Sequence, residues 1–167
     1  MTSESTPAKA AITIRGLVKR YHRRPVLDHL SLTLQDGVFC VLVGANGAGK
    51  TTLLRILATL VRPNQGKILI QGEPLQAGPG IRQGIGYIGH QSMFYEDLTA
   101  LENLQHYARI YGANQAQARI STAIQASGLD RFQNRPVRTF SRGMQQRLSI
   151  ERALLHHPKI LLFDEPY

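Results

Sequence analysis

A glycine-rich stretch that ends in a lysine and a threonine carries the clearest chemical signal in this sequence. The residues Gly44-Ala45-Asn46-Gly47-Ala48-Gly49-Lys50-Thr51 fit the pattern G-x-x-x-x-G-K-[ST]. Glycines allow such a loop to wrap a phosphate with its backbone N–H groups, while the lysine neutralises phosphate oxygens and the hydroxyl reaches Mg²⁺. The pattern therefore predicts a site for ATP and its magnesium ion, to which we also assign Thr52.

Two carboxylates near the other end of the sequence predict a second half of this site. Asp164 and Glu165 directly follow the apolar run at residues 160–163, which is typical of a buried strand. Ligands of α/β folds bind at the carboxyl ends of strands. We predict that Asp164 completes the magnesium shell and that Glu165 orients or deprotonates an attacking water. A solvated acidic pair is the alternative. The glycine-rich stretch at residues 44–51, which we call the phosphate loop, favours the catalytic interpretation.

A third segment indicates which class of phosphate-loop ATPase this is. The residues Phe140-Ser141-Arg142-Gly143-Met144-Gln145-Gln146-Arg147 resemble the signature motif of ABC-type ATPases, which usually reads L-S-G-G-Q followed by glutamines and an arginine. Ser141 and Gly143 match that motif. The segment departs from it at Phe140, Arg142 and Met144. An ordinary serine N-cap fits the local pattern equally well, but the order of the motifs along the chain is that of the family.

The resemblance covers nearly the whole chain from residue 11 and implies further site residues. Family members stack adenine on an aromatic residue upstream of the phosphate loop, which corresponds to Tyr21. They also use a glutamine that contacts Mg²⁺ and the attacking water, which corresponds to Gln91. The alternatives are a plain core or surface aromatic at Tyr21 and a loop-capping amide at Gln91. The resemblance also implies that ATP is sandwiched between the phosphate loop of one subunit and Ser141 and Gly143 of a second.

Hydropathy patterns predict the elements that must position the phosphate loop. Alternating apolar and polar residues at 12–14 and 30–34 predict two antiparallel strands. The continuous apolar run at 38–43 predicts a central strand covered on both faces. A helix is expected at 51–60 and a further strand at 67–70. This order of strand, loop, helix and strand is typical of an α/β fold.

Capping patterns predict helices in the second half of the chain. Thr99 and Glu102 form a capping box ahead of a periodic apolar pattern, and Asn114 repeats the capping pattern before a helix that ends at Gly128. Residues 93–139 therefore look like a helical insertion. Ser141 then precedes a helix that runs to about residue 156.

Two other patterns suggest sites that we reject. Residues 84–89 match G-x-G-x-x-G, yet they lie in a strand pattern and no helix opens at their end, as dinucleotide binding requires. His156 and His157 lie where a helix should end, so interaction with the helix dipole explains them better than metal binding. The single cysteine, Cys40, is expected to pack as a small buried residue.

The charge balance leaves two functional classes to compare. Lys and Arg total 20 against 11 Asp and Glu, a net charge of +9, which suggests a polyanionic partner. A basic run at residues 15–24 fits nucleotide phosphates or nucleic acid. A DNA-associated ABC-type ATPase would have a coiled coil or zinc-bearing insertion between Lys50 and Ser141, but the sequence over this separation of 91 positions has no heptad run and no cysteine. We therefore expect no nucleic-acid partner.

These observations together predict a fold class and domain limits. We expect an α/β fold, a P-loop NTPase core of ABC ATPase type with an antiparallel β flank and a helical subdomain at about residues 93–139. Residues 1–10 should form a flexible tail and 11–167 a partial ATP-binding domain. Family members continue after the acidic strand, so we expect that the C-terminal part is missing and that this chain alone binds nucleotide without hydrolysing it.

The resemblance also implies partners, a location and a substrate. Residues 90–99 with Glu102-Asn103-Leu104 look like the ATP-binding subunit of haem exporters of cytochrome c biogenesis. The implied function is to couple ATP hydrolysis to export through a separate transmembrane permease, with a second ATP-binding subunit, at the cytoplasmic face of the cell membrane. Another small-molecule, drug or lipid exporter is the alternative. We expect residues 93–139 to contact the permease, with Phe94, Tyr95 and Leu98 as anchors.

Overall fold

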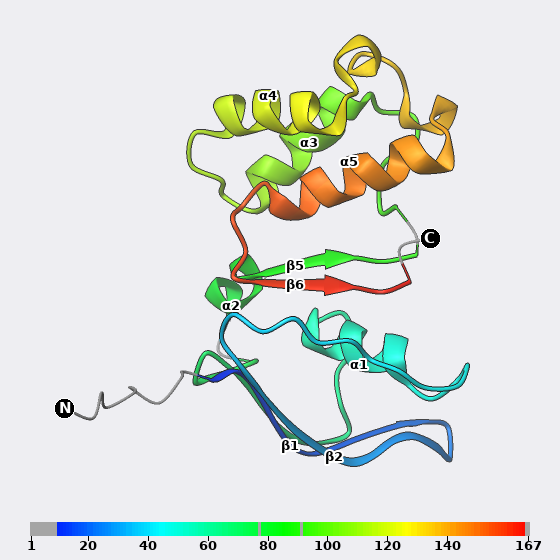
Figure 1. The fold of residues 1–167 in the computed structure, drawn as a ribbon, viewed down its shortest axis with the longest axis vertical. Coiled ribbons are helices and arrows are strands. Elements are labelled where there is room, and N and C mark those ends of the chain that lie inside the picture. The colour runs from blue at the N-terminus through cyan, green and yellow to red at the C-terminus, as the bar shows by residue number, and fades with distance from the viewer. Residues whose placement is uncertain (1–9, 77, 91, 166–167) are drawn as a thin grey trace, which may run out of the picture. The chain divides into compact units, whose positions relative to one another are not determined.

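The computed structural model describes residues 10–76, 78–90 and 92–165, and the chain divides into two compact units. One unit is Met1–Arg82 and the other is Gln83–Tyr167 (Figure 1). Of the tail predicted at residues 1–10, residues 1–9 lie outside the described residues, and Ala10 belongs to the first strand. No helix among the described residues has the length and apolar character needed to cross a bilayer.

The first unit contains a four-stranded antiparallel sheet. Its strands are β1 (Ala10–Tyr21), β2 (Arg24–Gln35), β3 (Gln65–Ile70) and β4 (Glu73–Pro74), in the spatial order β2-β1-β3-β4. The antiparallel pairing of β1 with β2 confirms the prediction from the two alternating stretches, and both strands are longer than those stretches. A two-residue turn joins them, so the predicted antiparallel flank is a long hairpin (Figure 1).

Strand register places the apolar residues of this sheet on one buried face. Ile12 and Ile14 of β1 pair with Ile70 and Ile68 of β3, and all four side chains are buried. Helix α1 (Lys50–Leu57) follows the phosphate loop and buries its own apolar positions, Leu53, Ile56 and Leu57. The helix predicted at 51–60 is therefore confirmed and ends three residues earlier than expected, at Leu57.

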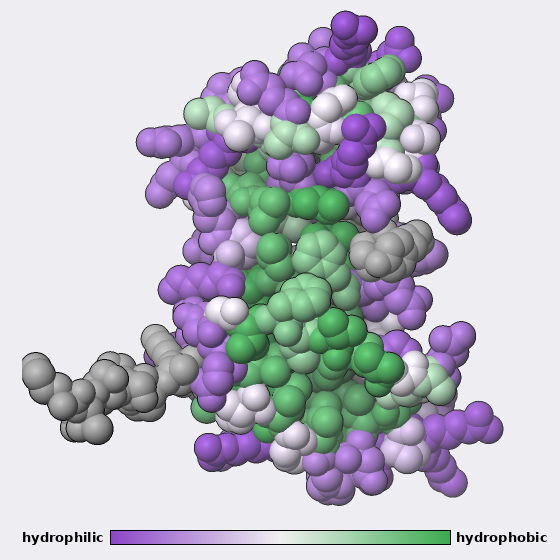
Figure 2. Space-filling model, viewed as in Figure 1, coloured by the Kyte–Doolittle hydropathy of each residue, from purple (hydrophilic) through white to green (hydrophobic). Residues whose placement is uncertain are grey.

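The central strand predicted at residues 38–43 is wrong. These residues have no strand assignment and no ladder partner among the described residues. The side chains of Phe39 and Val43 are 91% and 90% exposed, and Cys40, expected to be buried, is exposed as well. In Figure 2 a broad apolar area covers the viewed face of the first unit. An apolar run becomes a strand only beside another strand, because backbone N–H and C=O groups need partners.

The second unit contains a parallel strand pair with helices between its strands in sequence. Strand β5 (Ile85–Ile88) pairs with β6 (Ile160–Phe163) from Ile85 opposite Ile160 to Ile88 opposite Phe163 (Figure 1). The short helix α2 (Pro79–Gln83) precedes β5. The expectation that residues 160–163 are fully buried is wrong, since Leu161 and Phe163 are 41% and 43% exposed. Successive side chains of a strand point to opposite faces, and the face of β6 that carries Leu161 and Phe163 is uncovered, while Leu162 on the other face is buried.

Three helices form the remainder of the second unit. They are α3 (Ala100–Ile110), α4 (Ala116–Ser127) and α5 (Arg142–Leu154), with 3-10 turns η1 (Asp130–Phe132) and η2 (Val137–Thr139). Their shared apolar cluster includes the fully buried Leu104, Leu129, Val137 and Leu148. The contacts of α5 with this cluster mean that helical packing in this unit extends beyond residue 139.

The helix caps test the capping predictions directly. Thr99 caps α3 and Glu102 completes the capping box in both directions, as predicted. Helix α4 ends at Gly128, whose φ of 65° is the left-handed conformation that favours glycine. The cap predicted at Asn114 is wrong, because α4 begins after Gln115 without any side-chain cap.

Candidate functional site

Two glycines of the phosphate loop in the first unit have different structural roles. Gly47 and Gly49 have φ values of 82° and 92°, which glycine adopts more readily than other residues. A Cβ on Gly49 would lie 2.8 Å from the Val26 carbonyl oxygen and 2.9 Å from Leu27, whereas a Cβ on Gly47 would meet nothing within 4 Å. Gly49 therefore lets α1 begin against β2, and Gly47 lies on the open side of the loop.

Lys50 folds back over the loop that precedes it. Its Nζ donates hydrogen bonds to the carbonyl oxygens of Gly44 at 2.8 Å and Ala45 at 3.0 Å. Those bonds keep the ammonium group beside the loop. A phosphate can replace these carbonyl acceptors, since charged phosphate oxygens form stronger hydrogen bonds with an ammonium group.

The start of helix α1 supplies the other donors of the phosphate loop. Its N-cap, Gly49, has no side-chain capping bond, and the helix contains no acidic residue in its first turn. Amide N–H groups at such a helix end attract anions. Thr51 and Thr52 lie in this first turn, Ala48 donates its N–H to the Ala45 carbonyl, and Asn46 is exposed in the turn. The donor set fits the phosphates of a nucleotide.

Tyr21 lies at the end of β1 and remains accessible. Its ring is 44% exposed, and the Lys19 ammonium lies 4.8 Å from the ring centroid. A partly exposed aromatic ring beside a cation is compatible with stacking on a nucleobase. This exposure does not agree with a core aromatic, and a plain surface aromatic stays the alternative to nucleobase stacking.

The acidic pair lies in the second unit, at the carboxyl end of β6. Asp164 is 3% exposed, donates its backbone N–H to the Ile88 carbonyl at 2.8 Å and accepts the Tyr87 hydroxyl on Oδ2 at 2.9 Å. Glu165 is exposed, with a left-handed φ of 46°. The two neighbouring carboxylates therefore have different surroundings, one enclosed and hydrogen-bonded, the other open to solvent.

The chain offers oxygen donors that could bind a magnesium ion. No group of three or more His, Cys, Asp or Glu among the described residues could hold a metal ion. Mg²⁺ rarely needs such a cage, because it binds one or two carboxylates together with phosphate oxygens and waters. The buried Asp164 carboxylate and the Thr51 hydroxyl are hard oxygen donors of the required kind. The Thr51 hydroxyl belongs to the first unit and the Asp164 carboxylate to the second.

The signature residues begin helix α5. Ser141 is its N-cap, and its Oγ accepts the Met144 N–H at 3.3 Å. Gly143 lies in the first turn, and a Cβ there would meet nothing within 4 Å. The serine cap considered as an alternative is thus present. Both residues are also exposed, so a ligand can approach the helix end.

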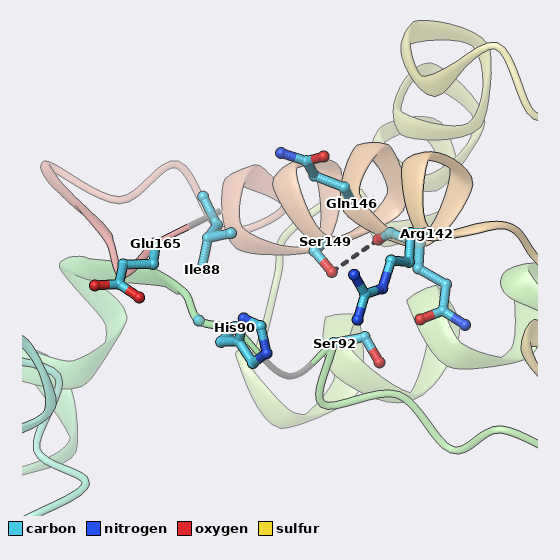
Figure 3. Close-up of a pocket in the computed structure, with 9 residues that line it drawn as sticks. Ile88, His90, Ser92, Arg142, Gln146, Ser149 and Glu165 are labelled. Carbon is cyan, nitrogen blue, oxygen red and sulfur yellow. Dashed lines mark hydrogen bonds between the residues drawn. The ribbon is translucent and has the colours of Figure 1, made fainter. Parts of the chain in front are cut away.

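A small pocket in the second unit is lined by residues of helix α5 and by Glu165. Its volume is about 120 Å³. In Figure 3, Arg142 and Ser149 extend from α5 toward Ser92 and His90, and Glu165 lies at the other end. Gln91 lies outside the described residues. The lining residues are Ile88, Gly89, His90, Ser92, Arg142, Gln145, Gln146, Ser149 and Glu165.

Arg152 is a buried cation that binds the backbone of β5, and the sequence did not predict this role. Arg152 is 2% exposed and donates from Nη2 to the Tyr87 carbonyl at 2.8 Å. Its guanidinium lies 5.0 Å from the Tyr107 ring centroid and 5.8 Å from that of Phe94. Its position on a basic helix was no signal of burial. The one indication of burial in the sequence was that Arg152 follows Leu148, a residue on the buried side of α5, by four positions.

Two further expectations about individual residues are corrected. Phe94, expected as an exposed anchor, is 9% exposed and packs in the helical cluster, whereas Tyr95 is 54% exposed. His156 does not behave as a cation at a helix end. Its ring stacks on Tyr111 at 4.1 Å and bonds the Ile85 carbonyl, and burial lowers its pKa.

Comparisons with known proteins agree with this geometry. The ABC transporter family profile matches residues 27–167. The chain is 43% identical over 141 residues to the ABC transporter ATP-binding protein NatA of Bacillus subtilis (strain 168), covering 82% of this chain and 57% of NatA. It is 36% identical over 144 residues to the cytochrome c biogenesis ATP-binding export protein CcmA of Cupriavidus necator, covering 86% of this chain and 63% of CcmA.

A solved structure agrees at the level of the fold. It is the dimeric structure of a post-hydrolysis state of the ATP-binding cassette MJ0796 bound to ADP and Pi. The TM-score is 0.84 at 27% identity, with 93% of this chain and 74% of that chain covered. The chain thus spans a little more than half the length of these curated relatives.

Proposed function

This chain belongs to the ABC transporter family, and we propose that it acts in the ATP-binding subunit of a transporter, where ATP hydrolysis is coupled to transport through a separate transmembrane permease. The observation that carries the proposal is the phosphate loop, with Lys50 held beside it and an uncapped helix end behind it. The curated relatives support it, because NatA and CcmA are both named as ATP-binding proteins.

The residues of the chain take distinct roles in this proposal. Backbone N–H groups of the loop and of α1 hold the phosphates, and Lys50 exchanges the Gly44 and Ala45 carbonyls for phosphate oxygens. Thr51 and Asp164 would hold Mg²⁺, which neutralises charge on the β and γ oxygens when bound. Glu165 orients the attacking water, and its exposure leaves its carboxylate accessible to that water.

A second ATP-binding subunit completes the site in this proposal. Ser141 and Gly143 of one copy would contact the nucleotide held by the phosphate loop of the other. The open surroundings of Gly143 support this role, as does the dimeric state named for the MJ0796 structure. We therefore propose that hydrolysis requires two copies and takes place at the cytoplasmic face of the membrane, where the permease holds the subunit.

The transported substrate is a finer part of the proposal. We propose haem export, supported by the resemblance of residues 90–99 to haem exporters and by the similarity to CcmA. NatA, whose name states no substrate, has the higher identity, so another small-molecule, drug or lipid exporter stays the competing function. Affinity purification of the protein from its source cells, with identification of the copurifying permease, separates them. A permease of cytochrome c biogenesis is expected, and a drug-exporter permease would contradict haem export.

Nucleotide competition tests the core of the proposal. The purified chain should bind a fluorescent ATP analogue, and unlabelled ATP should displace it in the presence of Mg²⁺. Adenosine is the matched competitor, because it keeps the base and ribose but lacks the phosphates that the loop binds. Displacement by ATP but not by adenosine is expected. Equal displacement by both, or no binding at all, would contradict a phosphate-centred site.

A further inference from the structure

Tyr87 lies beside the proposed magnesium ligand, and the proposed function gives it no role. It is the third residue of β5, opposite Leu162 of β6 in the parallel ladder. Asp164 follows β6 and is tied to β5 by the bond from its N–H to the Ile88 carbonyl. This register brings the Tyr87 hydroxyl to the Asp164 carboxylate, where it donates to Oδ2 at 2.9 Å.

The ring of Tyr87 depends on a glycine for its position. A Cβ on Gly89 would lie 2.9 Å from both Cε1 and Oη of Tyr87 and 3.1 Å from Cζ. Side chains do not approach that closely, so any other residue at position 89 requires the ring to move. The small residue at 89 therefore leaves the space in which the hydroxyl reaches Asp164.

The backbone of Tyr87 is fixed as well. The buried Arg152 donates to the Tyr87 carbonyl at 2.8 Å, and the rings of Tyr107 and Phe94 lie on its guanidinium. A charged donor makes a stronger bond to a carbonyl than a neutral one does. With the carbonyl fixed by Arg152 and the ring enclosed at Gly89, the hydroxyl occupies one defined point.

We propose that Tyr87 is a positioning residue for magnesium binding, whose hydroxyl holds the Asp164 carboxylate in the orientation that the metal of the nucleotide requires. The inference rests on the proposed function, since it assumes that Asp164 binds Mg²⁺. Carboxylates that bind metals are themselves hydrogen-bonded, and loss of such a partner commonly weakens metal binding by about 10- to 100-fold. The contribution of Tyr87 is expected to depend on the metal, because its hydroxyl donates to the carboxylate that we assign to Mg²⁺.

The test compares Tyr87→Phe with wild type in ATP affinity with Mg²⁺ and with EDTA. The full 167-residue chain is used, and a melting curve is recorded for each variant. In EDTA the two affinities should agree, while the gain in affinity on adding Mg²⁺ should be smaller by about tenfold in the variant. Tyr111→Phe is the matched control, since it removes a tyrosine hydroxyl of the same unit that lies away from Asp164.

A second variant reaches the same contact by another route. Gly89→Ala should displace the ring and reproduce the loss of Mg²⁺ dependence, and the double variant should lose no more than either single variant. A Mg²⁺ dependence in Tyr87→Phe or Gly89→Ala equal to that of wild type would overturn the inference alone. Wild-type affinity that does not change with Mg²⁺ would also overturn it. Failure of the wild-type chain to bind ATP in either condition would overturn the proposed function, and this inference with it.

Discussion

Glycines recur in two short segments of this chain, residues 44–49 and 84–89, and their surroundings differ. In the first, Gly47 has a positive φ and open space where a side chain would be. In the second, a Cβ on Gly86 would lie 2.7 Å from Leu161 and 2.8 Å from the Ala153 carbonyl oxygen, and Gly89 borders the Tyr87 ring. Glycine thus permits a backbone conformation at Gly47, whereas at Gly86 and Gly89 it permits the close approach of neighbours.

The two segments also differ in the backbone N–H groups that they offer to an anion. The first segment leads into the N-terminus of an eight-residue helix, where amide N–H groups are available to an anion. The second lies in a strand whose N–H and C=O groups pair with β6. A strand has no comparable concentration of unpaired donors at one point, so rejection of the dinucleotide pattern agrees with the structure.

The largest expected effect separates ligand binding from folding at the first segment. Lys50→Ala removes the ammonium group that we assign to the phosphates, and ATP affinity should fall by about 30- to 100-fold. The melting temperature should stay close to that of wild type, because the lysine bonds only two loop carbonyls. Fluorescence titration with ATP, together with a melting curve, measures both.

Lys67→Ala serves as the control for that variant, because it also removes one positive charge from the first unit. Lys67 is exposed on β3, away from the phosphate loop. Its loss should leave ATP affinity within about twofold. Equal losses in the two variants would mean that net charge, and not the position of Lys50, governs binding.

Substitution of Gly86 in the second segment should lower the stability of the protein. Gly86→Ala adds a Cβ where Leu161, the Ala153 carbonyl and Pro158 already make close contact. Such overpacking commonly costs about 1 to 3 kcal/mol in the free energy of unfolding. Urea denaturation monitored by circular dichroism measures the change.

Gly143→Ala is the matched control for Gly86→Ala in the same unit. It makes the same substitution in a helix where the new Cβ meets nothing within 4 Å. Alanine favours the helix by about 0.5 to 1 kcal/mol, so this variant should gain stability. A Gly86→Ala variant as stable as wild type would contradict the close packing of β5.

Gly47 provides a smaller and more specific test of backbone conformation. Gly47→Ala should destabilise the loop by about 1 kcal/mol, because a φ of 82° is strained for alanine although the space is open. Gly47→Asn should be milder, since asparagine adopts left-handed conformations more readily. Chemical denaturation of both variants checks the order. If alanine proved milder than asparagine, the positive φ would not be the reason for the glycine.

The smallest expected effect is a pH dependence of the stability of the protein, caused by one histidine that bonds the second segment. His156 bonds the Ile85 carbonyl of β5, and burial lowers its pKa below 6.5. Because the folded state binds this proton less readily than the unfolded state, stability is fully present above 6.5 and decreases as the pH falls toward the pKa of the folded state. Melting curves between about pH 7.5 and about pH 5.5 should show this loss.

Two histidine variants isolate that effect. His156→Phe keeps a ring against Tyr111 but removes the titrating group, so the pH dependence should become weaker. His157→Gln changes the exposed neighbour and should retain it. A pH dependence that disappears in His157→Gln and persists in His156→Phe would refute the assignment.

Two apolar runs show where pattern reasoning failed. Residues 38–43 and 160–163 have the same apolar character, and the sequence predicts a buried strand for each. The structure pairs the second run with β5, whereas the first has no strand beside it among the described residues. Hydropathy describes what a segment can bury. It does not identify the neighbouring backbone that would complete a ladder.

Local chemistry was the part of this protein that could be predicted from its residues. Caps and turns depend on groups a few positions apart, which is why the capping box at Thr99 and Glu102, the end of α4 at Gly128 and the helix after the phosphate loop agree with prediction. Contacts between distant segments were not predictable in this way. The bond from Tyr87 to Asp164, the burial of Arg152 and the exposure of Phe39 arise when β5, β6 and α5 come together or when a segment lacks a neighbour. Their spacing in the sequence carries no local signal, because the free energy of such contacts depends on which surfaces meet in space.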